Sequence, residues 1–390
     1  MAGGWQPLAG PAHRVALEIL LDGPLSRAEL ARRVGLSPGS LTRITKPMLE
    51  SGLLVEVSGG PVDPRVGRPS QPLDVVPAAH HFVGIKLTGD QAVGVLTTLR
   101  AEVIAAAELP LPDHAPAAVA ATVAELTKTL AAQSDSGLSG LGISLGGQVV
   151  GKSEVRSGSF LDWYDVPLGQ LMSAHTDVPV VVANDLTALT EATHWFGAGR
   201  GAARFCLITI GAGIGYGLVV HDKIVDTPES SLGLIGHHPL LPDGPRCERG
   251  HIGCASTLLT TDAIVSQVSA ALDGPGSADS TSTTRELTYD ECLDLAVKGE
   301  PAARQVVDRA GYALGRLVAT AANFTLPDRV VLGGEGVRLV DVAHDALLEG
   351  LHLDRHPEST DPPIVLLDAS FSEWARGAAV IAIQTFVLGS

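Results

Sequence analysis

The stretch GHHPLLPDGPRCERGHIGC places histidine and cysteine side chains close enough along the chain for metal chemistry. His237 is followed ten residues later by Cys247 and a further seven residues later by Cys254, with His251 between the two cysteines. Structural zinc prefers four imidazole or thiolate ligands. Arg249 stands where a third thiolate would be useful, and an arginine cannot bind a metal because it remains protonated. The stretch is therefore a metal site, an altered metal site, or a loop with two unrelated cysteines.

A second segment, SPGSLTRITKPML, combines small, hydroxyl-bearing and basic side chains. At helical spacing Leu41, Ile44, Met48 and Leu49 form one inward face, which leaves the polar residues on the other face. Small and hydroxyl residues allow close approach to DNA, and arginine or lysine can reach guanine edges or phosphates. We therefore expect DNA contacts from the exposed face, namely from Ser37, Gly39, Ser40, Thr42, Arg43 and Lys46.

Three helices and a strand are predicted around this segment. Ser26 and Ser37 suit the N-caps of the second and third helices, and Pro38 suits the first helical position. Gly35 between them can adopt a positive φ in a tight turn. The pattern predicts a helix-turn-helix with a recognition helix and a β-wing that begins near residue 53. The alternative is a small helical bundle that contacts protein.

Two further sets of arginines lie near this motif. Arg32 and Arg33 on the second helix suit a solvated face or phosphate contacts. Residues 59–72 are rich in Gly and Pro and predict a wing tip and linker. Within that segment Arg68 could enter an A·T-rich minor groove as part of an extended arm, and a plain linker is the alternative.

Beyond residue 80 the pattern repeats strand, glycine turn, strand and helix. GLGISLGGQVV, TIGAGIGYGLV and RVVLGGEG each place glycines after a buried strand, and VPVVVAND delivers Asn184 and Asp185 to the start of a helix. Three such turns suggest a cleft that binds phosphate or sugar. A Rossmann fingerprint does not fit, because no Gly-x-Gly-x-x-Gly opens a helix. Residues 273–287, rich in Ser, Thr, Gly and Asp, predict an exposed loop.

The totals limit the class of protein. A chain of 390 residues predicts two or three domains. The net charge of −16 lies beyond the head, because residues 1–80 hold eight Lys/Arg against seven Asp/Glu. No apolar run is long enough to span a bilayer and the N-terminus lacks a signal-peptide core, so we expect a cytoplasmic protein with no membrane partner. Four cysteines in so long a chain predict no disulfide framework.

In this arrangement the chain resembles the ROK family of repressors, uncharacterised reading frames and sugar kinases. The resemblance is carried, in order, by the helix-turn-helix, GRPS, NDLTALTEATHWFGAGRG, TIGAGIGYGLV, GLIGHHPL and C…GHIGC. It implies an α/β, actin-like (ribonuclease H-like) two-lobed body preceded by an all-α winged helix-turn-helix domain, and a homodimer or dimer of dimers. The implied domains are 1–72 with the linker, 73–185 with a returning C-terminal helix at 375–390, and 186–374 with the zinc-like loop.

The resemblance also exposes departures from the family's kinases. Their phosphate-binding turn follows Asp-x-Gly-Gly-Thr-Lys, whereas here Lys86, Thr88, Asp90 and Gln91 replace the aspartate, the first glycine, the threonine and the lysine. An acid in such a turn repels phosphate. Asp185 aligns with the family's catalytic base, yet a base without a phosphate donor transfers nothing. We therefore expect no ATP, no catalytic residue and no enzyme.

The effector and metal sites implied by the resemblance are incomplete. The resemblance assigns ligand binding to Gly147, Asn184, Asp185 and His237. Leu234 and Ser256, however, replace two acids that would bind sugar hydroxyls. The ligand is then an unusual or less polar sugar, another metabolite, or nothing, with the body acting as a dimerisation scaffold. His237, Cys247 and Cys254 hold zinc-ligand positions, and Arg249 replaces the fourth. Either His251 or His238 supplies a replacement ligand, water fills the position, or zinc is absent.

We accordingly predict a DNA-binding transcriptional regulator, a repressor of carbohydrate-related genes that binds a double-stranded operator and senses a small molecule. The alternatives are a sugar kinase with an accessory DNA-binding head and an effector-free DNA binder. Removal of residues 1–72 would abolish operator binding under the first hypothesis.

Overall fold

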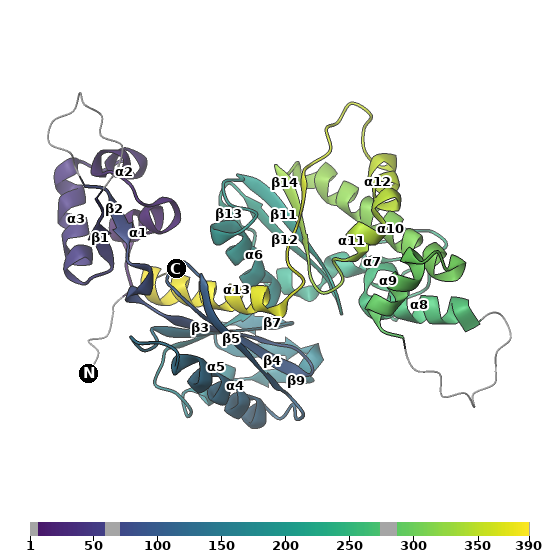
Figure 1. Ribbon diagram of the computed structural model, residues 1–390, viewed down its shortest axis with the longest axis horizontal. Helices are drawn as coiled ribbons and strands as arrows, with labels where there is room; N and C mark the ends of the chain where they lie inside the picture. The colour runs from purple at the N-terminus through teal and green to yellow at the C-terminus, as the bar shows by residue number, and fades with distance from the viewer. Residues whose placement is uncertain (1–6, 59–70, 274–286, 390) are drawn as a thin grey trace. The chain divides into compact units, whose positions relative to one another are not determined.

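The computed structural model describes residues 7–58, 71–273 and 287–389 (Figure 1). Arg68, most of the predicted linker and residues 274–286 of the predicted loop lie outside the described residues. The chain forms two compact units, Met1–Phe196 with Trp374–Ser390, and Gly197–Glu373. None of the helices in the described part of the chain has the length and apolar character needed to cross a membrane.

The head of the first unit has the predicted three helices followed by a strand. They are α1 (Gly10–Asp22), α2 (Arg27–Val34), α3 (Pro38–Glu50) and β1 (Leu54–Glu56). Ser26 accepts a hydrogen bond from the Glu29 N–H, and Gly35 adopts φ 67°. The head's core includes the fully buried Val15, Ile19, Leu30 and Leu41. The wing closes when β2 (Leu73–Val75), beyond the linker, pairs antiparallel with β1, a pairing that the local pattern does not predict.

The lobe that completes the first unit is built on a five-stranded sheet of order β10-β6-β3-β4-β5. Strands β3, β4 and β5 pair antiparallel in succession, while β6 pairs parallel with β3 and β10 pairs parallel with β6. A second, three-stranded sheet comprises β7, β8 and β9. The bounds are β3 (Phe82–Leu87), β4 (Gln91–Thr97), β5 (Val103–Pro110), α4 (Pro116–Ala131), β6 (Gly140–Leu145), β7 (Gln148–Val150), β8 (Glu154–Gly158), β9 (Trp163–Val166), α5 (Leu168–Met172), β10 (Val180–Asn184) and α6 (Asp185–Phe196).

The C-terminal helix α13 (Phe371–Ile383) packs directly on the backbone of this sheet, as Figure 1 shows in yellow. Glycines in the two central strands permit the close approach. A methyl group on Gly84 would lie 2.0 Å from the carbonyl oxygen of Ala375, and one on Gly142 would lie 1.9 Å from that of Ala378. A π-helical turn, Gln384–Leu388, ends the described chain next to α13.

The second unit repeats the topology of the first lobe. Its sheet has the order β13-β12-β11-β14-β15, with β11, β12 and β13 antiparallel and β14 and β15 added in parallel. This duplication is the architecture of an actin-like body. The bounds are β11 (Arg204–Ile210), β12 (Ile214–Val220), β13 (Lys223–Ile224), α7 (Ala255–Leu259), α8 (Thr261–Asp273), α9 (Tyr289–Val297), α10 (Pro301–Thr325), β14 (Arg329–Gly333), α11 (Leu339–Val342), α12 (His344–Leu353) and β15 (Ile364–Leu366).

Gly142→Ala should lower the free energy of unfolding by at least about 2 kcal/mol, because the added methyl group has to displace the backbone of α13. Urea denaturation of the full chain measures this. Gly213→Ala is the control, since a methyl group there would meet no described atom within 4 Å and φ is not in the left-handed region. Equal stability of the two variants would contradict the close packing.

Candidate functional site

The predicted DNA-contacting residues of the head lie together on α3 and its N-cap. Ser37 accepts a hydrogen bond from the Ser40 N–H at 3.2 Å, and Pro38 opens the helix. Thr42, Arg43 and Lys46 are exposed on the face opposite Leu41 and Met48. Gly39 is also exposed, and a side chain there would meet no described atom within 4 Å. The exposed face can therefore approach a flat or concave surface closely, as a major groove requires.

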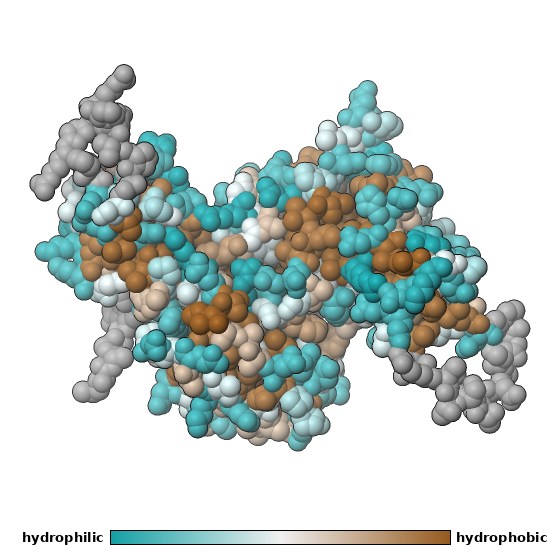
Figure 2. Space-filling model, viewed as in Figure 1, coloured by the Kyte–Doolittle hydropathy of each residue, from teal (hydrophilic) through white to brown (hydrophobic). Residues whose placement is uncertain are grey.

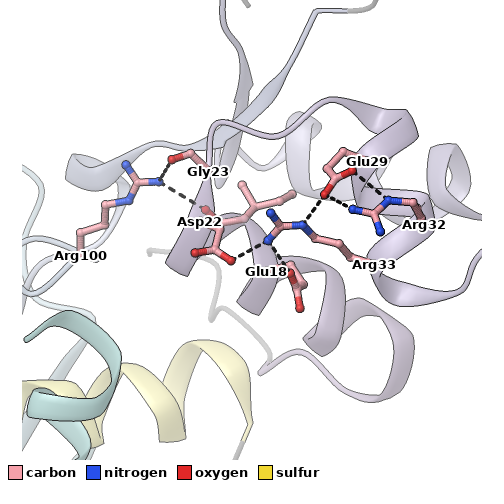
Figure 3. Close-up of polar contacts among 8 residues, drawn as sticks. Glu18, Asp22, Gly23, Glu29, Arg32, Arg33 and Arg100 are labelled. Carbon is pink, nitrogen blue, oxygen red and sulfur yellow. Dashed lines mark hydrogen bonds and ion pairs between the residues drawn. The ribbon is translucent and has the colours of Figure 1, made fainter. Parts of the chain in front are cut away.

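Arg33 is exposed and takes part in an ion-pair network with α1 and α2 (Figure 3). Its guanidinium contacts Asp22 at 2.6 Å and Glu18 at 3.3 Å on α1, and Glu29 at 2.8 Å on α2. Hydrogen bonds from Arg32 and Arg33 lower the pKa of Glu29 to about 2, and the bonds to Glu29 and Asp22 raise that of Arg33. Arg33 thus ties α1 to α2, whereas Arg32 is mostly exposed and pairs with Glu29.

In the lobe of the first unit, Asn184 links a glycine turn to the start of α6. Its amide nitrogen donates to the carbonyl of Gly147 at 2.9 Å, and its amide oxygen accepts from the Thr187 N–H at 3.0 Å. Gly147 has φ 140°, and a methyl group there would lie 2.0 Å from the Ser157 carbonyl oxygen. The structure therefore brings Gly147, Asn184 and Asp185 together at the carboxyl ends of β6 and β10. The fourth predicted ligand-binding residue, His237, belongs to the second unit.

Asp185 is not a free carboxylate. The ammonium of Lys86 on β3 forms an ion pair with Asp185 Oδ2, with the two side chains 7% and 13% exposed. The other oxygen, Oδ1, accepts from the Leu186 N–H at 2.8 Å. Lys86 Nζ also lies 5.1 Å from the centroid of the Trp374 ring on α13, within cation–π range. Both oxygens of the family's base position are therefore already engaged.

The neighbouring turn between β3 and β4 is closed by its own side chains. The Thr88 hydroxyl donates to Asp90 Oδ1 at 2.6 Å and accepts from the Gln91 N–H at 3.1 Å. In a phosphate-binding turn such N–H groups point at the ligand. Here one of them points at Thr88, and a carboxylate occupies the turn, so the local charge and geometry disfavour phosphate.

In the second unit, three of the four predicted metal ligands converge. One ligand atom from each of His237, Cys247 and Cys254 lies within 4.8 Å of the other two. Cys247 Sγ is 3.8 Å from His237 Nδ1 and 3.6 Å from His251 Nδ1. Tetrahedral zinc with its usual bond lengths separates sulfur and nitrogen ligands by about 3.6 Å. The donor chemistry and spacing thus fit a metal ion, with His251 beside the cluster and Arg249 exposed.

The loop that carries these ligands is held by its backbone. The Cys247 N–H donates to His251 O at 2.9 Å, and bridges join Pro239 to Cys254 and Arg246 to Ile252. Partial burial and the nearby positive charge of Arg249 lower the pKa of His237. Burial opposes ionisation of the Cys247 thiol, but the surrounding backbone N–H groups outweigh it and lower its pKa. Both shifts favour metal-binding protonation states.

The two positions that lack the family's acids, Leu234 and Ser256, differ in their surroundings. Leu234 is 58% exposed, while Ser256 donates to the carbonyl oxygen of Gly236 at 2.8 Å. The remaining cysteines, Cys206 and Cys292, are buried, and burial raises the pKa of the Cys206 thiol to about 12. Neither has the environment of a reactive thiol.

The fold and these residues define a winged helix-turn-helix joined to an actin-like, sugar-kinase-type body. Residues 82–385 match the ROK family and residues 16–55 match the winged helix-turn-helix DNA-binding family. The chain therefore belongs to the ROK family.

Relatives of both functional kinds are found. The chain is 27% identical over 358 residues to the DNA-binding transcriptional repressor Mlc of Escherichia coli, covering 90% of this chain and 86% of that protein. It is 29% identical over 306 residues to a glucokinase of Halalkalibacterium halodurans, covering 74% and 89%. The crystal structure of a ROK family transcriptional regulator, a homologue of E. coli Mlc, superposes with TM-score 0.81 at 27% identity, covering 97% and 96%.

Two functional contacts escaped the sequence-based analysis. Lys86 was recognised as a missing aspartate but not as the partner of Asp185, which lies 99 residues away. A lysine inside the otherwise apolar strand FVGIKL is the signal that could have revealed it, because a buried ammonium needs a partner. Arg33 is exposed, as expected of a solvated face, but its ion pairs were missed because Glu18 and Asp22 on α1 become its neighbours only when the two helices pack.

Lys86→Met should lower the free energy of unfolding by about 3–5 kcal/mol, because it leaves Asp185 buried without its counter-charge. Lys86→Met combined with Asp185→Asn should recover most of that loss, since the amide can still accept from Leu186. Urea denaturation of both variants, with the exposed Lys128→Met as the control, measures the effect. A double variant no more stable than Lys86→Met alone would show that the loss does not come from the ion pair.

Proposed function

We propose that the chain is a DNA-binding transcriptional repressor that senses a small molecule through a body that transfers no phosphate. The observation that carries the proposal is the recognition helix, whose polar face is exposed while its apolar face packs in the core of the head. Similarity to the repressor Mlc extends over 90% of the chain and supports the same conclusion. A double-stranded DNA partner agrees with the expected cytoplasmic location.

The ion pair between Lys86 and Asp185 supports the non-enzymatic part of the proposal. A general base must accept a proton from the reacting hydroxyl group. The ammonium of Lys86 and the N–H of Leu186 occupy the two oxygens of Asp185 that would do so. With the phosphate turn closed by Thr88 and Asp90, the site would bind a sugar or related metabolite without phosphorylating it, through backbone groups and the second amide N–H of Asn184, the first being bonded to Gly147.

A homo-oligomer belongs to the same proposal, because an operator with two half-sites requires two recognition helices. Exposed apolar side chains on the second unit support self-association. Phe324, Leu326 and Leu353 are 83%, 62% and 61% exposed, and a hydrogen bond from Asn323 to the Asp354 carbonyl holds the ends of α10 and α12 side by side. Figure 2 shows hydrophobic residues among hydrophilic ones on the visible face of this unit.

We further propose zinc as the metal of the His237, Cys247 and Cys254 cluster, with His251 as the fourth ligand. The ion would supply a structural cross-link for the loop from residue 237 to residue 254. His251 Nδ1 lies 3.6 Å from Cys247 Sγ, against 3.8 Å for His237 Nδ1, and the centroids of the two imidazole rings are 5.3 Å apart. Arg249, which stands where the family has a cysteine, is exposed.

Arg43→Ala should weaken binding to a preferred duplex by about 1–3 kcal/mol and relax sequence preference, because it removes a base-edge contact. Lys46→Ala should weaken all duplexes alike and reduce the salt slope by about 1. Fluorescence anisotropy with duplexes that the wild-type protein enriches from a random library measures both, with the exposed Arg14→Ala on α1 as the control. Hexose-dependent ATP consumption lost in Asp185→Asn, together with no enriched duplex, would instead establish the kinase alternative.

The purified protein should contain one zinc ion per chain by elemental analysis. Cys247→Ser and His251→Ala should each reduce zinc affinity by more than about tenfold, because each removes a direct ligand. His238→Ala is the matched control, since it removes the neighbouring imidazole. Equal losses in His238→Ala and His251→Ala would refute the assignment of the fourth ligand.

A further inference from the structure

The turn between β4 and β5 presents one arginine to the DNA-binding head within the first unit. The Thr98 N–H donates to Glu102 O at 3.0 Å, and the Thr98 hydroxyl accepts from the N–H groups of Arg100 and Glu102. Ala101 completes the turn with φ 55°. The backbone of Arg100 is therefore fixed before its side chain makes any contact with the head.

The Arg100 guanidinium caps the end of α1 (Figure 3). Nε donates to the Leu20 carbonyl, and Nη2 to those of Ile19 and Gly23, each at 3.3 Å. The last carbonyls of a helix lack partners within the helix and carry partial negative charge, so a cation there is stabilising. Helix α1 has no basic residue of its own in its last turn. The lobe supplies the missing charge.

The same guanidinium also holds the wing. Arg100 Nη2 lies 2.5 Å from Asp74 Oδ1 on β2, the strand that pairs with β1, and the two side chains are 23% and 16% exposed. Gly23 leaves just enough room for this contact, because a methyl group there would lie 2.5 Å from both Asp74 Oδ1 and Ile19 O. One side chain of the lobe thus joins two separate elements of the head.

Other contacts connect the Arg100 site to the recognition helix in the head and to the Thr88 turn in the lobe. Within the head, Arg33 links α1 to α2 through Asp22 and Glu18, and α2 leads directly into α3. Within the lobe, β4 runs from Gln91, at the Thr88 turn, to the turn that carries Arg100. A second attachment, from Leu8 and His13 to the carbonyls of Val387 and Leu388, fixes the other end of α1.

We infer that Arg100 is a positioning residue for DNA binding, which sets the orientation of the helix-turn-helix on the lobe by clamping the end of α1 and the wing strand together. This inference rests on the proposed DNA-binding function. A guanidinium suits the role because its planar fork serves several acceptors at once, which an ammonium on a flexible stem does less well. In the described part of the head, Arg100 bonds to the end of α1, to Gly23 and to β2 rather than to α3, so it acts through α1 and β2.

The test compares Arg100→Met, Arg100→Lys and Asp74→Asn with the exposed Arg156→Met in the full chain. Hydrogen exchange should accelerate at residues 19–25 and 73–75 in Arg100→Met and Asp74→Asn, while circular dichroism shows a folded head. Affinity for the enriched duplex should fall about tenfold or more with an unchanged salt slope, because the phosphate contacts on α3 remain intact. Arg100→Lys should restore part of the affinity through its charge.

Two results would overturn the inference. Unchanged exchange at residues 19–25 in Arg100→Met would show that the clamp does not hold the head. Accelerated exchange with duplex affinity equal to that of Arg156→Met would show that the clamp is structural and does not position the head for DNA. If the wild-type protein enriched no duplex, the proposed DNA-binding function would be wrong. The hydrogen-exchange measurement would then still show whether Arg100 holds α1 and β2 to the lobe.

Discussion

One buried ion pair joins three elements of the first lobe and engages its Asp185 carboxylate. Lys86 on β3 and Asp185 at the start of α6 neutralise each other, and the Trp374 ring on α13 borders the ammonium. Either charge buried without the other would destabilise the fold strongly. The ion pair therefore favours the packing of β3, α6 and α13 against one another. The pair also engages the carboxylate that a kinase would need free. The same contact therefore stabilises the lobe and carries the proposal that the body transfers no phosphate.

Each unit has an antiparallel hairpin, and within the first unit the hairpin of the lobe contacts the head through Arg100. Its strand β4 begins at the closed Thr88 turn and ends at the turn of Arg100. Strand β4 pairs with β3 on one side and with β5 on the other, with a shift of register at Leu96 and Thr97 near its end. Within the first unit, β4 therefore connects the turn beside the proposed ligand site with the turn whose Arg100 contacts the end of α1.

Local chemistry made the head and the motif positions predictable from sequence. The two helices and their turn are predicted by the caps Ser26 and Ser37 and by Gly35, because each of these residues acts on backbone within four residues of itself. The placement of Asn184 at the end of a strand also followed from the local pattern, whereas the convergence of Cys247 with Cys254 followed from the resemblance to the family. What escaped were pairings between distant segments, such as β1 with β2 and Lys86 with Asp185. No local pattern encodes these partners, since they meet only when the sheets and helices pack.

The central claim is that a kinase-like body serves as a sensor that controls a DNA-binding head. The most direct test measures the affinity of the intact protein for its enriched duplex across a panel of neutral sugars, amino sugars and sugar phosphates, with ATP consumption followed in the same samples. The account predicts that at least one compound changes duplex affinity saturably while ATP remains unconsumed. Duplex affinity indifferent to every compound, or ATP turnover with any sugar, would contradict it.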